Sequence, residues 1–218
     1  MIDLYAYIDV ESSGVLRPEL PPDDPSQPRI ISLSTLLTTA DRRVVGSMYR
    51  IVKPDGWSIE VEAQQVHGIS ERLAHEVGVP IWFVLAELEQ FVTKATRIIG
   101  HNIQGFDRLM IARELQLAGQ HGVWWHSRAR DFVDTMELSA PLLGLTGRVV
   151  GEPKFPTLEE AVRFLGRGFD VFDDDPNFAE VEGGKLTSWQ QSHRADEDAR
   201  AVEFCHWRLR TMEESLVR

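Results

Sequence analysis

The chain has 218 residues, of which 43% are apolar, and its formal net charge at pH 7 is −11. This length suits one globular domain, so we expect a single domain over residues 1–218 and no second full domain. The acidic balance argues against a protein that coats long nucleic acids, because such proteins neutralise phosphates with lysine and arginine. It is compatible with an enzyme that binds divalent cations on carboxylates, since the cations then meet the phosphate.

The first part of the chain predicts β-structure. A strand-like alternation at Leu4 to Glu11 and two further β-rich runs, at Arg29 to Thr38 and Val44 to Val52, indicate three strands. The last two are separated by a turn-like segment, so the three strands can form an antiparallel meander. Between the first two lies a proline-rich loop insertion at 16–28, which cannot form regular structure and is expected to be exposed.

After this region the pattern changes to helices that alternate with short strands. A helix is predicted at Val79 to Thr96, with Phe83, Leu85, Leu88, Phe91 and Val92 as its apolar stripe. The further predicted elements are a strand at Arg97 to Gly100, a helix at Gly105 to Leu117 with Leu109, Ala112, Leu115 and Gln116 on successive turns, a strand at Asp131 to Asp134, a helix at Thr157 to Leu165, and a long helix from about Asp196 to Glu214. Such an order indicates an α/β fold, with a mixed sheet flanked by helices. An acidic loop insertion is expected at 166–190.

The sequence shows no pattern of paired cysteines, no signal peptide and no apolar run long enough to span a membrane. Its only cysteine, Cys205, excludes an internal disulfide and fits a reducing environment. Asp9 interrupts the first apolar run too early for a signal peptide, and no stretch approaches the ~18 apolar residues of a membrane span. We therefore expect a soluble cytoplasmic protein without a membrane partner.

A first acidic cluster interrupts the first predicted strand. Asp9 and Glu11 lie two residues apart, so they point to one face of that strand. Two neighbouring carboxylates repel each other and are costly to desolvate unless a cation lies between them. A metal ion explains the pair, and the alternative is a strand end whose acids reach water.

A second cluster follows the short strand at residues 97–100. Asn102 lies just beyond this strand, and Asp107 enters the next helix. Strand ends are where α/β sheets build their sites. The alternative interprets Asn102 as a turn residue and Asp107 as a first-turn acid that the helix dipole favours.

The third cluster lies at the start of the last helix. Asp198 shares a helical stripe with Val202, Cys205, Leu209 and Met212, so its carboxylate should point into the protein and needs a partner there. His193, just before the helix, can bring an imidazole to the same place. The alternative for His193 is a structural role.

Taken in order, these clusters resemble the DEDDh branch of the ribonuclease H-like (DnaQ-like) 3′-to-5′ exonucleases. That family has a D-x-E strand motif, an H-N motif followed by an aromatic residue and Asp, and H-x4-D at a terminal helix. Here these motifs read Asp9-Val10-Glu11, His101-Asn102-Ile103-Gln104-Gly105-Phe106-Asp107 and His193-Arg194-Ala195-Asp196-Glu197-Asp198. The segment Gln65 to Ser70 also resembles the family's segment against the terminal nucleotide, and Phe132 to Thr135 its strand before the next helix.

Other details favour TREX-like members of the family. The middle motif has one residue more between His101 and Asp107 than the pattern of bacterial proofreading subunits, and is closer to the TREX-like spacing. The sequence Cys205-His206-Trp207-Arg208 is also TREX-like. The resemblance extends from Tyr7 to about Arg210.

The resemblance implies a ribonuclease H-like mixed five-stranded sheet and a single exonuclease domain. The implied activity is metal-dependent hydrolysis of phosphodiester bonds at the 3′ end of DNA, which releases nucleoside 5′-monophosphates. The implied catalytic residues are Asp9, Glu11, Asp107, His193 and Asp198, and the implied substrate contacts are Val10, Ser12, His67, Ile69 and Asn102. The four acids would hold two divalent cations, Mg²⁺ or Mn²⁺, and His193 would act as the general base.

Alternative functions stay open on the sequence alone. An exoribonuclease would use the same chemistry, and the choice depends on tolerance of the 2′-hydroxyl group. A non-catalytic module that holds a strand end or a protein would use the same fold without turnover. The expected partner is a nucleic acid 3′ end, with single-stranded DNA as the first choice; a homodimer or an accessory role beside a polymerase or helicase are further options.

Overall fold

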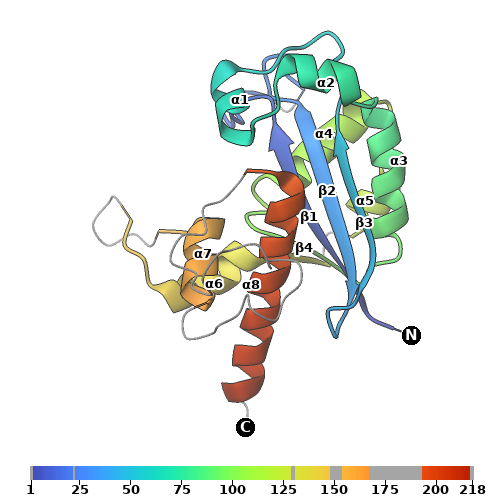
Figure 1. Cartoon of the computed structure of the whole chain (residues 1–218). Helices are drawn as coiled ribbons and strands as arrows, with labels where there is room; N and C mark the ends of the chain where they lie inside the picture. Colours follow the sequence, from blue (N-terminus) through green and yellow to red (C-terminus); the bar gives the residue numbers. More distant parts are fainter. Residues whose placement is uncertain (1, 22, 129–130, 148–153, 167–192, 217–218) are drawn as a thin grey trace.

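The computed structural model describes residues 2–21, 23–128, 131–147, 154–166 and 193–216, and for residues 215 and 216 it describes the backbone alone. Its centre is a five-stranded sheet in the order β3-β2-β1-β4-β5 (Figure 1). The strands are β1 (Leu4–Ser12), β2 (Ile30–Thr39), β3 (Val44–Ile51), β4 (Arg97–Gly100) and β5 (Phe132–Asp134). β1, β2 and β3 form an antiparallel meander, whereas β4 runs parallel to β1 and β5 parallel to β4. The predicted mixed five-stranded sheet is confirmed.

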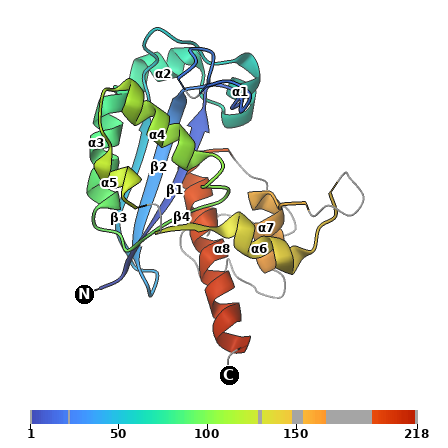
Figure 2. The ribbon, with the colours of Figure 1, turned by 180° about the vertical axis from the view of Figure 1, so that it is seen from behind.

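Helices cover both faces of this sheet. They are α1 (Val61–His67), α2 (Glu71–Val77), α3 (Ile81–Val92), α4 (Asp107–Leu117), α5 (Val123–His126), α6 (Thr135–Leu143), α7 (Leu158–Leu165) and α8 (Ala195–Leu216). In Figures 1 and 2, α3 and α4 lie on one face, while α8 crosses the other face with α7 beside it. In the part of the chain that is described, none of these helices is long and apolar enough to cross a membrane.

Strand β1 is central because both of its faces meet a core. Ile8 and Val10 point to the α3 and α4 side, where they pack in the larger apolar cluster. Tyr7 points to the opposite side and packs with residues of α7 and α8. Each fully buried side chain of this size contributes about 1.5–3 kcal/mol. The alternation of β1 therefore assigns its odd-numbered residues, including the two acids, to the α8 side.

The predicted apolar stripes of α3 and α4 are confirmed in part, since Leu85, Leu88, Val92 and Leu115 are buried, but Phe83, Leu109 and Gln116 are exposed. Val84 is fully buried, whereas Phe83 lies at the surface with its ring edge against Trp82. In α4 the core positions include Met110 and Ile111, and Leu109 is 49% exposed. Both helices carry apolar residues at neighbouring positions, so periodicity alone cannot choose the face, and the docking of each helix on the sheet decides it.

No helix was predicted at the positions of α1 and α2. Each has seven residues and buries one of them, so neither carries a readable apolar stripe. Their boundaries come from local chemistry: Gly68 ends α1 in a left-handed conformation with φ 72°, and Ser70 caps α2 by accepting a hydrogen bond from the N–H of Leu73.

The loop at 16–28 has no helix or strand among its described residues, as predicted, but it is not fully exposed. Gln27 is buried, and its side-chain amide bonds both the N–H and the carbonyl oxygen of Arg17. Arg113 of α4 donates to the carbonyl oxygen of Pro28. These contacts tie the loop to the domain. All but the first residue of the predicted insertion at 166–190 lie outside the described residues.

Candidate active site

The carboxylates of β1 lie at the end of the strand, on the face that α8 covers. Asp9 is paired in register with Ser34, and Glu11 with Ser32, on β2. A β-bulge follows directly, between Glu11 and Ser12. β-Bulges change the direction of side chains next to functional sites, and this bulge lies directly after Glu11.

The first turn of α8 brings a third carboxylate to this strand end. Asp198 is fully buried, and the residues Val202, Cys205 and Leu209 of its stripe are buried as predicted. One ligand atom each from Glu11, His193 and Asp198 lies within 4.8 Å of the others. Residues near the two ends of the chain thus meet in one place.

A fourth carboxylate comes from the opposite face of the sheet. Asp107, at the start of α4, is 3% exposed, and its Oδ1 accepts a hydrogen bond of 3.0 Å from the N–H of Val10. The preceding turn is held by Asp134, whose carboxylate accepts from the N–H groups of Asn102 and Gln104. Asp134 also caps α6, because its side chain accepts a hydrogen bond from the N–H of Met136. Its role at the site is to fix the turn that leads to Asp107.

The backbone adopts a left-handed conformation at Asn102 and His193, two residues near the carboxylates of the site. Among the described residues, non-glycine residues with positive φ are Arg42, Asn102 and His193, with φ of 67°, 62° and 50°. Such conformations cost about 1–3 kcal/mol each and persist only where the surroundings hold them. Two of the three flank the carboxylates.

Burial and mutual repulsion hold protons on these acids. The pKa of Asp9 is raised well above its usual range by burial and by the charges of Asp198, Asp107 and Glu11. Burial, with Asp198 and Asp107, raises the pKa of Glu11 to about 8. Burial also raises the pKa of Asp107 to about 7, with a contribution from Asp134, against the lowering effect of its backbone hydrogen bonds. In this structure the charges of Asp9, Glu11 and Asp107 therefore oppose one another at the end of β1.

This arrangement fits divalent cations. Carboxylate oxygens are the hard donors that Mg²⁺ and Mn²⁺ prefer, and a cation among them would remove the repulsion that raises their pKa values. Burial lowers the pKa of His193 below its usual range, although Glu159 opposes the shift. Its imidazole is therefore neutral at pH 7 and can accept a proton.

A small pocket of about 180 Å³ lies beside Glu11, and Ser12 and His67 line it. His67 is 4% exposed, and its Nδ1 accepts from the N–H of Ile69. The side chain of Ile69 itself lies in a separate core, so its contribution is this N–H. The Val10 side chain is likewise in the core, and its N–H is engaged by Asp107. Substrate contact by Val10 and Ile69 stays a prediction.

One residue of this face was missed from the sequence. The register aligns Asp9, Ser34 and Tyr49 across three strands, so they share a face. Burial raises the pKa of Tyr49, and the charge of Asp196 adds to the shift. The phenol therefore stays protonated beside the acids. Only the strand register, which the sequence does not specify, could have indicated it.

The raised pKa of Glu11 predicts how stability depends on pH without metal. The folded protein keeps this proton up to about pH 8, whereas the unfolded chain releases it near the ordinary value of about 4.3. The folded state thus binds more protons in this window, so its stability falls as pH rises from about 5 to 8. We expect Glu11→Gln to remove this loss, with a gain over wild type that grows to about 2 kcal/mol at pH 8 after allowance for partial exposure.

Denaturant unfolding in chelator at pH 5 and pH 8 measures this gain. Glu62→Gln, on exposed α1, is the control and should give the same small change at both pH values. A stability difference between Glu11→Gln and wild type that shrinks as pH rises would contradict the assignment.

The sheet order, the acids at the end of its central strand and the covering helix define the ribonuclease H-like fold of exonucleases. Crystal structures of E. coli exonuclease I have this fold: one in complex with a dA16 oligonucleotide matches with 18% identity and a TM-score of 0.64, and one with a dT13 oligonucleotide with 17% identity and a TM-score of 0.67. A zinc-bound form of its complex with single-stranded DNA matches with 18% identity and a TM-score of 0.67.

These matches cover 96–99% of this chain but 41–42% of the exonuclease I chain. The chain therefore spans about two fifths of the length of these structures. At this level of identity the likeness establishes the fold. No protein-family model matches the sequence, and no curated protein matches it.

Proposed function

We propose that this protein is a divalent-cation-dependent 3′-to-5′ exonuclease that acts on single-stranded DNA and releases nucleoside 5′-monophosphates. The observation that carries the proposal is the meeting of Glu11, His193 and Asp198 within 4.8 Å. A fold without this chemistry has no reason to bury repelling acids next to a neutral imidazole. The fold likeness to exonuclease I, whose structures hold single-stranded DNA, supports the choice of polymer.

In this proposal the four acids hold two cations, Mg²⁺ or Mn²⁺. Asp9 would be a ligand that both cations share, Glu11 and Asp198 would be ligands of the first, and Asp107 would be a ligand of the second, directly or through water. The bound ions would supply positive charge against the phosphate and a more acidic water molecule. Acids that are already gathered without metal cost little reorganisation when the ions bind.

His193 is the proposed general base. One of its ring nitrogens is within 4.8 Å of a carboxylate oxygen of Glu11 and of Asp198, so it stands beside the proposed reacting water. Because burial keeps the imidazole neutral, a ring nitrogen can take the proton from that water as the water oxygen attacks the phosphorus and the P–O3′ bond breaks, which leaves a 3′-hydroxyl group on the shortened strand. The pocket beside Glu11, with Ser12 and His67, is the proposed seat of the terminal nucleotide.

Single-stranded DNA and RNA oligonucleotides of one sequence test the proposal. With Mg²⁺, a 3′-labelled DNA should release labelled mononucleotide from the first turnover, and a 5′-labelled DNA should shorten stepwise. Chelator should abolish both, and circular single-stranded DNA should stay intact. Cleavage of the circle, or cleavage that chelator does not affect, would contradict the proposal.

The same assay distinguishes DNA from RNA as the preferred substrate, and an enzyme from a non-catalytic binding module. Faster trimming of RNA than of DNA would favour an exoribonuclease. Binding of either strand without turnover would favour a non-catalytic module. Asp198→Asn should be inactive, and Glu197→Gln, an exposed neighbour on the same helical turn, should keep wild-type activity.

A further inference from the structure

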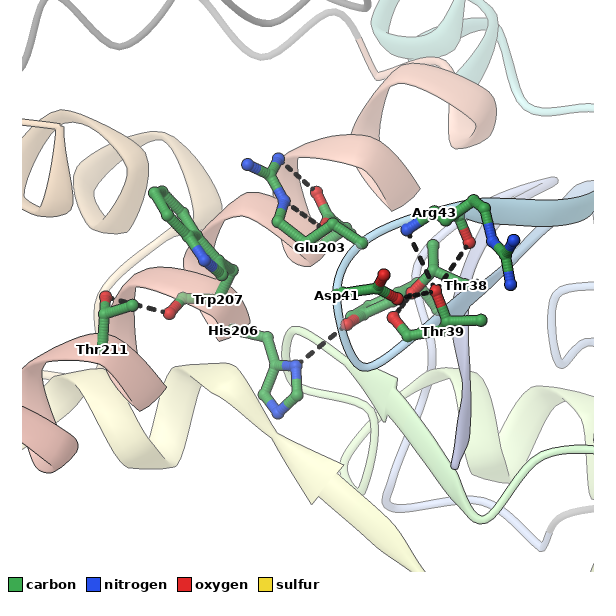
Figure 3. Close-up of polar contacts among 10 residues, drawn as sticks. Thr38, Thr39, Asp41, Arg43, Glu203, His206, Trp207 and Thr211 are labelled. Carbon is green, nitrogen blue, oxygen red and sulfur yellow. Dashed lines mark hydrogen bonds and ion pairs between the residues drawn. The ribbon is translucent and has the colours of Figure 1, made fainter. Parts of the chain in front are cut away.

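A second set of contacts joins α8 to the sheet, further toward the C-terminal end of the helix than Asp198. Arg42, at the tip of the β2–β3 hairpin, forms a two-pronged ion pair with Glu203 of α8: its Nε lies 2.7 Å from Oε1 and its Nη2 2.9 Å from Oε2. The guanidinium also lies over the ring of Trp207, 4.5 Å from the ring centroid. Figure 3 shows Glu203 and Trp207 projecting from the helix beside the hairpin. We call the Arg42, Glu203 and Trp207 contact the hairpin clamp.

The hairpin tip is built to hold its arginine in one position. Arg42 has φ 67°, a left-handed conformation in which glycine or asparagine is the usual choice. The tip is closed by backbone hydrogen bonds from Arg42 N–H to Thr39 and between Thr39 and Arg43. The Thr39 hydroxyl donates to Asp41 and accepts from the N–H of Arg43 (Figure 3). A strained residue in a closed turn indicates that its side chain is needed there.

A neighbouring contact joins α8 to β1 itself. The Tyr7 hydroxyl oxygen lies 3.0 Å from Nδ1 of His206, and Tyr5 meets the same imidazole edge-on at 5.5 Å between ring centroids. These tyrosines belong to the strand face that carries Asp9 two residues later. Burial, with the charge of Arg210, lowers the pKa of His206 to about 4, so this imidazole is neutral and adds no charge near the acids.

Asp198 of the site and Glu203 of the hairpin clamp belong to the same helix, α8. Glu203 follows Asp198 by five residues, roughly 7.5 Å along the helix axis. Asp198 lies in the first turn of α8 and His193 just before it, so the position of this helix sets how close both side chains lie to Glu11 of β1. The clamp holds the helix from the far edge of the sheet, because the hairpin that carries Arg42 belongs to β2 and β3.

We propose that Arg42 and Glu203 are positioning residues that keep α8, and with it Asp198 and His193, in place for the cations before these bind. This inference rests on the proposed function. Neither residue lines the proposed substrate pocket, and their ion pair joins the hairpin tip to α8, so we expect their effect to pass through the position of the helix. Their loss should weaken cation binding, and saturating cation should restore most of the turnover.

Titration calorimetry with Mn²⁺ and no DNA tests the inference. We expect Arg42→Gln and Glu203→Gln each to raise the dissociation constant for Mn²⁺ about tenfold, which is the effect of losing groups that orient metal ligands. Arg42→Lys keeps the charge but loses the two-pronged geometry, so it should lie between wild type and Arg42→Gln. Turnover of Arg42→Gln should approach wild type as Mn²⁺ is raised.

The matched control is Arg72→Gln, which breaks the exposed Arg72–Glu76 ion pair of α2 and should leave Mn²⁺ binding unchanged. If Arg42→Gln unfolds, Arg42→Lys carries the test. Equal Mn²⁺ affinity in wild type and in folded clamp variants would overturn the inference and leave the proposed function standing. Absence of Mn²⁺ binding by the wild type would overturn both.

Discussion

Asp9→Ala is expected to lose all cation-dependent turnover, down to the background that wild type shows in chelator. Asp9 is the proposed bridge between the two cations, so no other acid can take its place. Without metal the same change should leave folding intact or improve it, because Asp9 is a buried acid whose neighbours repel it. A gain of about 1 kcal/mol would raise the melting temperature by about 2–4 °C.

Thermal unfolding with and without Mg²⁺ separates the two parts of this expectation. Wild type should gain stability from Mg²⁺, and Asp9→Ala should gain none. Asp3→Ala, an exposed acid just before β1, is the control and should behave as wild type in both assays. A melting temperature that falls by many degrees would mean that Asp9 is structural, and retained turnover would remove it from the site.

His193→Ala is expected to slow turnover by ~10²-fold or more while the affinity for Mn²⁺ stays close to that of wild type, as for the loss of a general base. The wild-type rate should fall on the acidic side, below the ordinary histidine pKa of about 6.5, because only the neutral imidazole accepts a proton and burial lowers its pKa. The variant should lack this acidic limb.

Rate measurements from pH 5 to 8 and calorimetry with Mn²⁺ check this prediction together. His75→Ala, an exposed histidine of α2, should leave both quantities unchanged. A large loss of Mn²⁺ affinity in His193→Ala would make this residue a metal ligand. An unchanged rate would exclude it from the reaction.

The elements that the sequence predicted well are those whose pattern is long or capped. Nine alternating residues identify β1, and the Asp198 stripe of α8 repeats over four turns. Helix α7 begins where a capping box stands, since Thr157 and Glu160 each bond the other's backbone N–H. Because alternation and periodicity encode which face is buried, they also indicated that Asp9 and Asp198 point inward.

Other features depend on contacts between distant segments, which no local pattern encodes. The choice of Val84 over Phe83 as a core residue follows from how α3 docks, not from its composition. The capture of the Val10 N–H by Asp107 spans 97 residues. The ion pair of the hairpin clamp joins residues that are 161 positions apart in the sequence. Its arginine lies in a turn at a position where glycine or asparagine is usual. Register and docking must be known before such residues can be recognised.

The order of the site residues along the chain has a consequence during synthesis. Asp9 and Glu11 leave the ribosome first, but Asp198 belongs to α8, the last element, and nearly two hundred residues separate them. Domains that depend on such distant contacts close late. Under the proposed function, a polypeptide whose synthesis has not reached α8 holds the strands of its central sheet but lacks Asp198, so cleavage of DNA would begin only after this helix docks.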